Sequence, residues 1–444
     1  MSGTRELFEP TNPKEVNLYV CGITPYDSPH VGHGRVYVTF DILYRLLRFL
    51  GYEVTYVRNF TDVDDKLIAR AAKELGDSSQ YREIADKYID VFNKNMEELG
   101  CIPPMHEPRV TDHIKEIIAF VGGLIKSGHA YVADGDVYFS IKTFDPYGKL
   151  SKRNLDDLLA GARVDVSEKK RDPLDFALWK GEAEGSFWKS PWGYGRPGWH
   201  IECSTLARLF LGDQLDIHGG GMDLIFPHHE NEIAQSEALL GVTFAPYWVH
   251  NAFVRINKEK MSKSKGNFFT LDDIFAETDP MVVRYLYLQH QYRNPLDFDP
   301  DQLKEVQKSY EKLIRICAGK TKDVTPEQII ESSSPIIQKM LHFLYDDLNT
   351  PGMFGVVFEH AQDIQKDPEL KSMVKTILST ILGLSLEPLA KQKVEITPEI
   401  KELIKKRDEA RKRKDYTTAD ALRDKLRELG VDVQDPKITD SLPK

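Results

Sequence analysis

The amino-acid sequence predicts an α/β fold in which a parallel-sheet domain is interrupted by an insertion and followed by a helical C-terminal region. Three observations support this prediction. A strand, a helix and a second strand follow one another within residues 17–58, mixed short strands and turns occupy residues 126–195, and the pattern is almost wholly helical from about residue 300. A strand–helix–strand unit of these lengths is expected to be right-handed and parallel.

Residues 17–21 form the first predicted strand, because they are mostly apolar and precede a loop rich in Gly, Pro, Asp and Ser. A helix is predicted from about His33, where apolar residues recur at spacings of three and four. These apolar residues are Val36, Phe40, Leu43, Leu47 and Leu50. Gly51 stands where a glycine would end the helix, and residues 53–58 form the second predicted strand.

Residues 126–195 carry mixed short strands, turns and two charged stretches, and we interpret them as an insertion. Residues 391–397 are typical of a linker. A single charged helix is predicted after it, from Glu399 to Leu429, closed by Gly430.

Composition excludes several classes of protein. The chain has 444 residues, of which 41% are hydrophobic and 29% charged, as in ordinary soluble globular proteins of about three domains. No stretch reaches the roughly 18 apolar residues of a membrane span, and we expect neither a membrane partner nor a secretory signal. Four cysteines lie far apart, which argues against a disulfide scaffold and predicts a reduced, cytoplasmic protein.

The first motif with chemistry lies between the first strand and its helix, at His30-Val31-Gly32-His33. Ligands bind at the carboxyl ends of parallel strands, and the N-terminus of a helix favours phosphate. Two imidazoles three residues apart, with Gly32 allowing close approach, could therefore bind a triphosphate and stabilise its developing charge. Taken alone, two surface histidines in a turn would explain the motif equally well.

A second motif, Lys260-Met261-Ser262-Lys263-Ser264, continues as Lys265-Gly266. A small glycine-containing loop with three lysines suits a mobile clamp on pyrophosphate. Most lysine runs are simply solvated loops, although this order of residues is unusual by chance.

Together the two motifs resemble the HIGH and KMSKS signatures of class I aminoacyl-tRNA synthetases. The first appears as His30-Val31-Gly32-His33 and the second letter for letter at 260–264. The resemblance implies a Rossmann-type catalytic domain. It also implies that His30, His33, Lys260 and Lys263 are catalytic and that Gly32 helps to bind ATP, with Mg²⁺ accompanying the nucleotide.

A third group of residues could bind a metal. His228 and Glu232 are four residues apart in a predicted helix, which places them on one face, as two ligands of one metal require. With the thiolates of Cys21 and Cys203 they would suit zinc. Without the other motifs, two buried cysteines and a surface His–Glu pair would be the more common explanation.

The surrounding strings resemble the cysteinyl-tRNA synthetase family in particular. The matching segments are 18–27, 59–66, 149–163, 198–204 and 218–237. The resemblance implies one zinc ion per chain, held by Cys21, Cys203, His228 and Glu232, that binds the substrate thiol. His229, one residue along, is an alternative ligand that the family pattern leaves outside the shell. Gly22, Thr61 and Trp199 are implied to bind the substrate cysteine.

The thiol chemistry predicts that no editing domain is needed, because zinc favours a thiolate over the harder, less acidic hydroxyl of serine. The glycines at 219–221 could form a loop for phosphate or adenine, or a plain tight turn.

At the C-terminal end, residues 401–429 contain eleven Lys or Arg and seven Asp or Glu, a net of +4 in a chain of net −10. A local basic excess of this kind is what phosphate contacts require, although most charge runs are solvated helices. Arg407–Arg411 and Tyr416–Asp424 resemble the family's tRNA-binding segment. The ending at 435–444 lacks the family's Trp-containing basic strand.

These expectations divide the chain into six segments. Residues 1–125 are the first half of the catalytic domain, 126–195 a connective insertion and 196–247 the second half with the zinc site. Residues 248–305 carry the KMSKS loop, 306–390 form a helical anticodon-binding domain and 391–444 form a basic tRNA-binding segment.

The resemblance implies a monomeric cysteine–tRNA ligase that forms cysteinyl-adenylate from L-cysteine and ATP and transfers cysteine to the 3′ end of the tRNA for cysteine. One alternative is a relative that joins activated cysteine to an amino-sugar acceptor. Another is a zinc-holding interaction protein without catalysis. The helical residues 306–444 argue against the first, and intact His30, His33 and Lys263 argue against the second.

Overall fold

The computed structural model describes residues 3–153, 169–256, 259–260, 268–389, 398–413 and 415–428. The chain divides into two compact units, Met1–Glu387 and Pro388–Lys444. Within the described residues, no helix is both long and apolar enough to cross a membrane.

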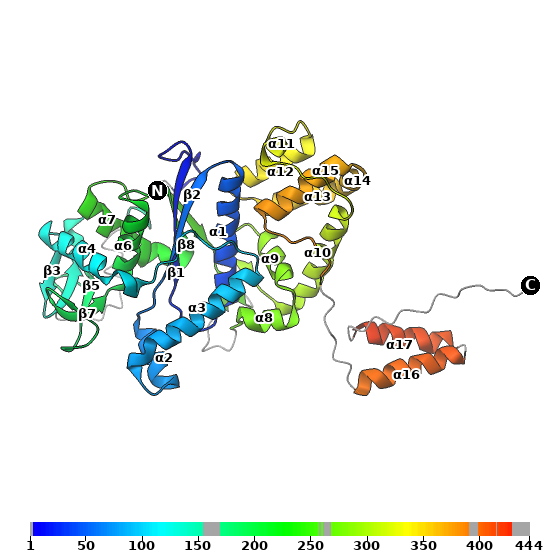
Figure 1. Cartoon of the computed structure of the whole chain (residues 1–444), viewed down its shortest axis with the longest axis horizontal. Helices are drawn as coiled ribbons and strands as arrows, with labels where there is room; N and C mark the ends of the chain where they lie inside the picture. The colour runs from blue at the N-terminus through cyan, green and yellow to red at the C-terminus, as the bar shows by residue number, and fades with distance from the viewer. Residues whose placement is uncertain are drawn as a thin grey trace, which may run out of the picture. The chain divides into compact units, whose positions relative to one another are not determined.

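A four-stranded parallel sheet forms the centre of the larger unit (Figure 1). Its strands are ordered β2 (Glu53–Phe60), β1 (Glu15–Ile23), β8 (Ile217–Gly221) and β9 (Tyr247–Asn251), and each neighbouring pair is parallel. Helix α1 (Val31–Phe49) connects β1 to β2. The structure thus confirms the predicted parallel-sheet α/β fold. The glycines at 219–221 end strand β8, so they form neither a tight turn nor a separate loop.

Helix α1 begins two residues earlier than the apolar periodicity indicates. His30 is its N-cap, and its imidazole accepts hydrogen bonds from the backbone amides of Gly32 and His33, in place of the usual hydroxyl or carboxylate. The helix ends at Phe49 with Leu50 as its C-cap, and Gly51 follows with φ of 87°, a left-handed conformation that favours glycine. Most of the helix is buried, because it lies between the sheet and the helices that follow later in the chain.

Residues 130–197 contribute a second, antiparallel sheet, ordered β3 (Ala130–Ala133), β4 (Asp136–Phe139), β5 (Phe176–Gly181), β7 (Gly193–Pro197) and β6 (Trp188–Ser190). The helices that precede or follow it are α2 (Asp65–Glu74), α3 (Tyr81–Glu98), α4 (Ile114–Lys126), α6 (Trp199–Leu211) and α7 (Glu230–Leu240). One apolar core runs from β1 through α4 and α6 into this sheet, and it includes both Cys21 and Cys203.

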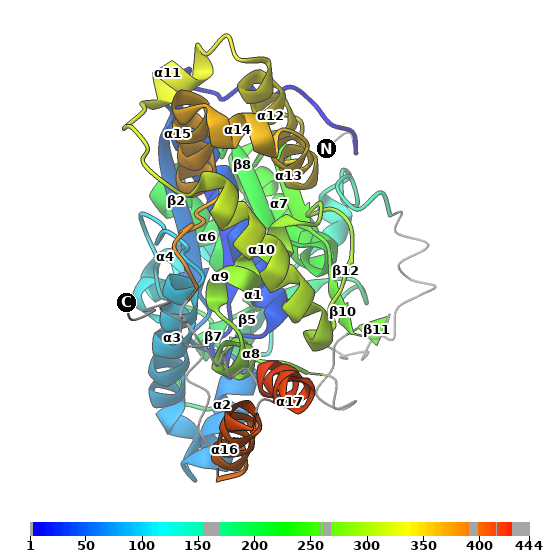
Figure 2. The same cartoon turned by 90° about the vertical axis from the view of Figure 1, so that its right-hand side faces the viewer.

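A third, small sheet contains β11 (Glu259–Lys260), β10 (Val254–Ile256) and β12 (Leu296–Asp297), in that order (Figure 2). Further α-helices in the described part of the larger unit are α8 (Leu271–Glu277), α9 (Pro280–Leu288), α10 (Leu303–Cys317), α11 (Pro326–Ile330), α12 (Pro335–Tyr345), α13 (Thr350–Glu359), α14 (Ala361–Lys366) and α15 (Pro368–Thr376). Helix α9 packs against α1, and α10 packs against α9 (Figures 1 and 2).

The smaller unit corrects one prediction. The single helix expected from Glu399 to Leu429 is two helices, α16 (Pro398–Lys412) and α17 (Tyr416–Glu428), which pack against each other around Leu403 and Leu426. Asp415 explains the break, because its carboxylate accepts a hydrogen bond from the backbone amide of Thr418 at 3.2 Å and so caps the second helix. The predicted linker at 391–397 lies outside the described residues.

Candidate active site and metal centre

A cavity of about 590 Å³ opens at the carboxyl ends of β1 and β8. Cys21 and Gly22 line one part of it, and His30, Gly32 and His33 line another. Asp223 and Trp199 contribute to its wall. The volume lies within the range of pockets that enclose small molecules, and the position is where open parallel sheets bind ligands.

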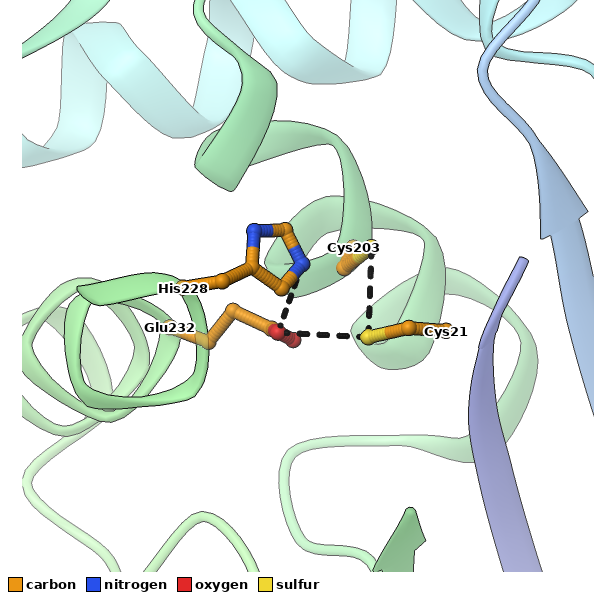
Figure 3. Close-up of side chains that lie close together, drawn as sticks. All are labelled: Cys21, Cys203, His228 and Glu232. Carbon is orange, nitrogen blue, oxygen red and sulfur yellow. Dashed lines mark hydrogen bonds and ion pairs between the residues drawn. The ribbon is translucent and has the colours of Figure 1, made fainter. Parts of the chain in front are cut away.

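The four residues predicted to bind zinc come together beside this cavity (Figure 3). Their ligand atoms all lie within 4.8 Å of one another. Cys21 Sγ is 3.9 Å from Cys203 Sγ and 3.5 Å from Glu232 Oε1, which in turn is 3.1 Å from His228 Nε2. None of the four side chains is more than 4% exposed.

Four different elements supply these ligands. Cys21 lies near the end of β1 and Cys203 in the second turn of α6. Glu232 lies in the first turn of α7, whereas His228 belongs to the irregular turn η5 (Ile225–His229) immediately before that helix. The spacing of four residues nevertheless brings the two side chains together, as the sequence predicts.

A layer of further histidines holds these groups in place. His218 Nε2 lies 2.8 Å from Glu232 Oε2, and His200 Nδ1 lies 2.8 Å from His228 Nδ1. Side chains that orient metal ligands in this way are a regular feature of metal centres. No sequence periodicity points to His200 or His218, because the contacts join elements distant in the chain.

Asn59 is another site residue that the sequence does not reveal. Its Oδ1 accepts hydrogen bonds from the Tyr19 hydroxyl at 3.1 Å and from the Gly22 amide at 2.9 Å, and it lies 3.6 Å from Cys203 Sγ. Asn59 therefore ties the end of β2 to the end of β1 beside the cluster.

Close contacts within the cluster favour the charged forms of Glu232, His228 and Cys203. Burial alone would raise the pKa of the Glu232 carboxyl, but the imidazoles of His218 and His228 hold it well below its usual range. Burial would lower the pKa of His228, but Glu232 and Cys203 raise it to about 10. The hydrogen bond from Cys21 lowers the pKa of Cys203 to about 6, whereas burial raises that of Cys21. A metal ion would take the place of the protons in this network.

His229, the alternative ligand, also lies next to the cluster. Its Nε2 is 3.3 Å from Cys21 Sγ, and its Nδ1 is 2.9 Å from His250 Nε2. With Cys21, His218 and Glu232 it forms a second set of close ligand atoms. Both sets share Cys21 and Glu232, so the two could not be filled independently.

The three residues expected to bind the substrate have different surroundings. Trp199 is 42% exposed, lines the cavity and stacks on His228 with ring centroids 4.3 Å apart. Gly22 also lines the cavity, and a Cβ there would lie 1.5 Å from the Asn59 carbonyl oxygen, so only glycine fits. Thr61 is buried behind the wall, and its hydroxyl donates to Glu202 at 2.7 Å.

His30 and His33 form a stacked pair with ring centroids 3.7 Å apart. Nδ1 of His30 accepts from the amides of Gly32 and His33, and Nδ1 of His33 accepts from the amide of His30 at 3.2 Å. Burial lowers the pKa of His30 to about 4 and that of His33 well below its usual value. Both rings are therefore neutral at pH 7, with the proton on Nε2 available for donation.

Lys260 lies in β11, where its backbone pairs with Arg255 of β10. Lys263 falls outside the described residues, as does the rest of the predicted loop at 261–267.

Comparison with known proteins decides the family. Residues 7–308 match the family described as tRNA synthetases class I (C) catalytic domain, and residues 393–437 match the Cysteinyl-tRNA ligase anticodon binding domain. A cysteine–tRNA ligase of Trichlorobacter lovleyi is 46% identical, over 98% of this chain and 96% of that protein. One of Geobacter metallireducens is 44% identical, over 97% and 96%. The chain belongs to the cysteine–tRNA ligase family.

Solved structures agree with this assignment at the level of the fold. Mycobacterium tuberculosis methionyl-tRNA synthetase in complex with methionyl-adenylate superimposes with a TM-score of 0.63 at 15% identity, covering 84% of this chain and 92% of that one. The cysteine–tRNA ligase family forms aminoacyl-tRNA from an amino acid, ATP and tRNA. The amino-sugar alternative is not favoured, because an anticodon-binding match is present and the relatives cover almost the whole chain.

Proposed function

We propose that this cysteine–tRNA ligase selects L-cysteine at a zinc ion held by Cys21, Cys203, His228 and Glu232. The observation that carries the proposal is the position of the cluster, because Cys21 belongs both to the cluster and to the wall of the cavity. Two sulfurs, one imidazole and one carboxylate, all buried, are a donor set that suits zinc. Bound zinc would supply a soft Lewis acid that favours a substrate thiolate over a serine hydroxyl.

The chain's own residues would then place the amino acid for activation. Trp199 covers His228 and faces the cavity, where it would confine the small cysteine side chain. Gly22 leaves room for the ligand close to the end of β1. Thr61 would support the site from outside the cavity lining, because its hydroxyl donates to Glu202 and accepts from the side-chain amide of Asn59.

In the first step, the cysteine carboxylate attacks the α-phosphate of ATP, forming cysteinyl-adenylate and releasing pyrophosphate. His30 and His33 would donate hydrogen bonds from their Nε2–H groups to oxygens of the reacting phosphate, where charge develops. Lys260 and Lys263 would draw the β- and γ-phosphates, and Mg²⁺ would accompany the nucleotide. In the second step, the terminal ribose hydroxyl of the tRNA for cysteine takes the acyl group, with α16 and α17 contributing to tRNA binding.

Two matched variants test the metal assignment. Cys203 and Cys317 are both 2% exposed, but Cys317 lies in α10 and belongs to no ligand set found among the described residues. We expect Cys203→Ala to lose bound zinc and cysteine-dependent pyrophosphate exchange, while Cys317→Ala keeps one zinc per chain and near-normal exchange. Full zinc content and normal exchange in Cys203→Ala would refute the proposed ligand set.

A further inference from the structure

Arg35 follows the His30–Gly34 segment directly, yet neither the metal site nor the phosphate site explains it. Its side chain is 1% exposed. Burial lowers its pKa to about 10, so the guanidinium still carries its charge at pH 7. Buried arginines are normally paired with carboxylates. In the described part of the chain, the hydrogen-bond partners of Arg35 are backbone carbonyls instead.

Four carbonyl oxygens surround the guanidinium. Nη1 donates to the carbonyls of Ala252 and Phe253, both at 3.1 Å. Nη2 donates to the carbonyls of Gln291 and Asn294, at 3.1 and 2.6 Å. The planar fork of arginine suits such an arrangement, because its donors lie in fixed directions, whereas a lysine ammonium is a single compact donor group.

These carbonyls belong to the two segments that lead into the small third sheet (Figure 2). Residues 252–253 precede β10 and residues 291–294 precede β12, and the two strands pair in parallel through Val254 and Leu296. On its other side β10 pairs with β11, where Arg255 lies opposite Lys260. Arg35 therefore holds the segment that leads into β10, and β10 in turn pairs with the backbone of Lys260 in β11.

The same helix carries the two imidazoles. His30 caps α1 and His33 lies in its first turn, so Arg35 is only two residues beyond His33. A second link is made by Thr39, whose hydroxyl lies 2.9 Å from Oδ1 of Asn251, the last residue of β9. Helix α1 thus joins the imidazoles at its start to the strand that leads toward Lys260.

We propose that Arg35 is a positioning residue that sets the distance between Lys260 and the His30–His33 pair. The inference rests on the proposed roles of Lys260 and the two histidines in binding the phosphates of ATP. Groups that act on opposite ends of one triphosphate must be held at a fixed separation, and a misplacement of about 1 Å costs on the order of 10²-fold in rate. Arg35 would affect the activation of cysteine by ATP without contacting the amino acid.

A double-mutant cycle between Arg35 and Lys260 tests this, with cysteine-dependent pyrophosphate exchange as the assay. Arg35→Lys keeps the charge but not the fork. We expect it to lower kcat about 10²-fold while the KM for cysteine changes less than about threefold and the zinc content stays unchanged. In a Lys260→Ala background the same change should cost much less, because the group being positioned is then missing.

Arg284→Lys is the matched control. Arg284 lies in α9, is fully buried, and donates to the carbonyls of Leu382 and Leu99 as well as to Asp41, none of which leads into the third sheet. We expect it to lower the melting temperature about as much as Arg35→Lys but to leave kcat within about threefold. A second variant, Arg35→Gln, keeps fewer donors and should lose at least as much activity as Arg35→Lys.

Three results would overturn the inference. One is strict additivity of the Arg35 and Lys260 effects. Another is an equal, small loss of kcat in Arg35→Lys and Arg284→Lys. The third is failure of both Arg35 variants to fold when Arg284→Lys folds, which would make Arg35 a folding requirement only. The single variant Lys260→Ala separately tests the proposed function, because normal exchange in that variant would contradict the role given to Lys260 itself.

Discussion

Nε2 of His228 lies 3.1 Å from Oε1 of Glu232, and the two side chains are 1% and 0% exposed. A buried carboxylate and imidazole at this separation stabilise each other's charged forms. The imidazoles of His218 and His228 together hold the pKa of the Glu232 carboxyl well below its usual range, so burial does not neutralise it. The pair is also half of the proposed zinc ligand set, which reaches the cavity through Cys21 in its wall.

The histidines around the ligands should matter for metal affinity. His218→Ala removes the partner that lies 2.8 Å from Glu232 Oε2 and leaves that oxygen without its orienting group. We expect the affinity for zinc, measured by competition with a chelator, to fall about 10- to 100-fold. His113→Ala, at a partly buried position that belongs to no ligand set found among the described residues, is the control and should leave the affinity unchanged. Equal affinities in both variants would show that His218 does not support the metal.

His30 has two separable tasks, because Nδ1 caps α1 and Nε2 is free to donate to phosphate. Both His30→Asn and His30→Ala lack the Nε2 donor, so pyrophosphate exchange should fall by about 10²-fold or more in each. Only His30→Ala also loses the cap, and it should be less stable than His30→Asn by about 1 kcal/mol in urea unfolding. If His30→Asn retained normal exchange, the imidazole would have no role at the phosphate.

The low pKa of His30 predicts how stability depends on pH. Burial lowers this pKa to about 4, whereas an unfolded histidine titrates near about 6.5. Above pH 6.5 neither state binds the proton, so His30 contributes no pH dependence. As the pH falls from about 6.5 to about 4, only the unfolded chain gains the proton, and the free energy of unfolding decreases.

Urea unfolding of the wild type and of His30→Asn isolates this effect. The measurements should be made at several pH values from about 4.5 to about 7, a range that lies roughly between the folded and unfolded pKa values. The difference in stability between the two proteins should change steadily in favour of His30→Asn as the pH is lowered. A constant difference across this range would mean that the imidazole titrates alike in the folded and unfolded chain.

The helix pair α16 and α17 of the smaller unit should determine how the affinity for tRNA depends on salt. Lys412 is the last residue of α16 and Arg413 follows it, and both side chains are exposed. If both contact phosphates, replacing them with alanine lowers the slope of log affinity against log salt by about two. Cysteine-dependent pyrophosphate exchange needs no tRNA and should be unchanged. An unaltered slope would place the phosphate contacts elsewhere.

Much of the fold could be predicted from the sequence where local periodicity and capping agree. Helix α1 and its flanking strands follow from apolar spacing and from Gly51. The start of α1 was missed by two residues because its cap is an imidazole, which capping rules based on hydroxyl and carboxylate side chains do not include. The break between α16 and α17 was missed because the cap at Asp415 lies within a continuous charged pattern.

The site was predictable to a similar extent. The spacing of His228 and Glu232 and the family strings were enough to name four residues that the fold brings together. His200, His218 and Asn59 were not predictable, because their contacts join elements brought together only by tertiary packing. Thr61, which is expected at the substrate, is not among the residues that line the cavity, and its hydroxyl donates to Glu202, a buried partner that the sequence does not reveal.

We propose that buried thiolate, imidazole and carboxylate ligands select cysteine through a bound zinc ion. The most direct test is charging of the tRNA for cysteine by protein of measured zinc content, with L-cysteine and L-serine in parallel assays. We expect one zinc per chain, efficient charging with cysteine and a serine rate lower by several orders of magnitude, both activities being lost when zinc is removed. Comparable charging with serine, or full cysteine selectivity in zinc-free protein, would contradict the account.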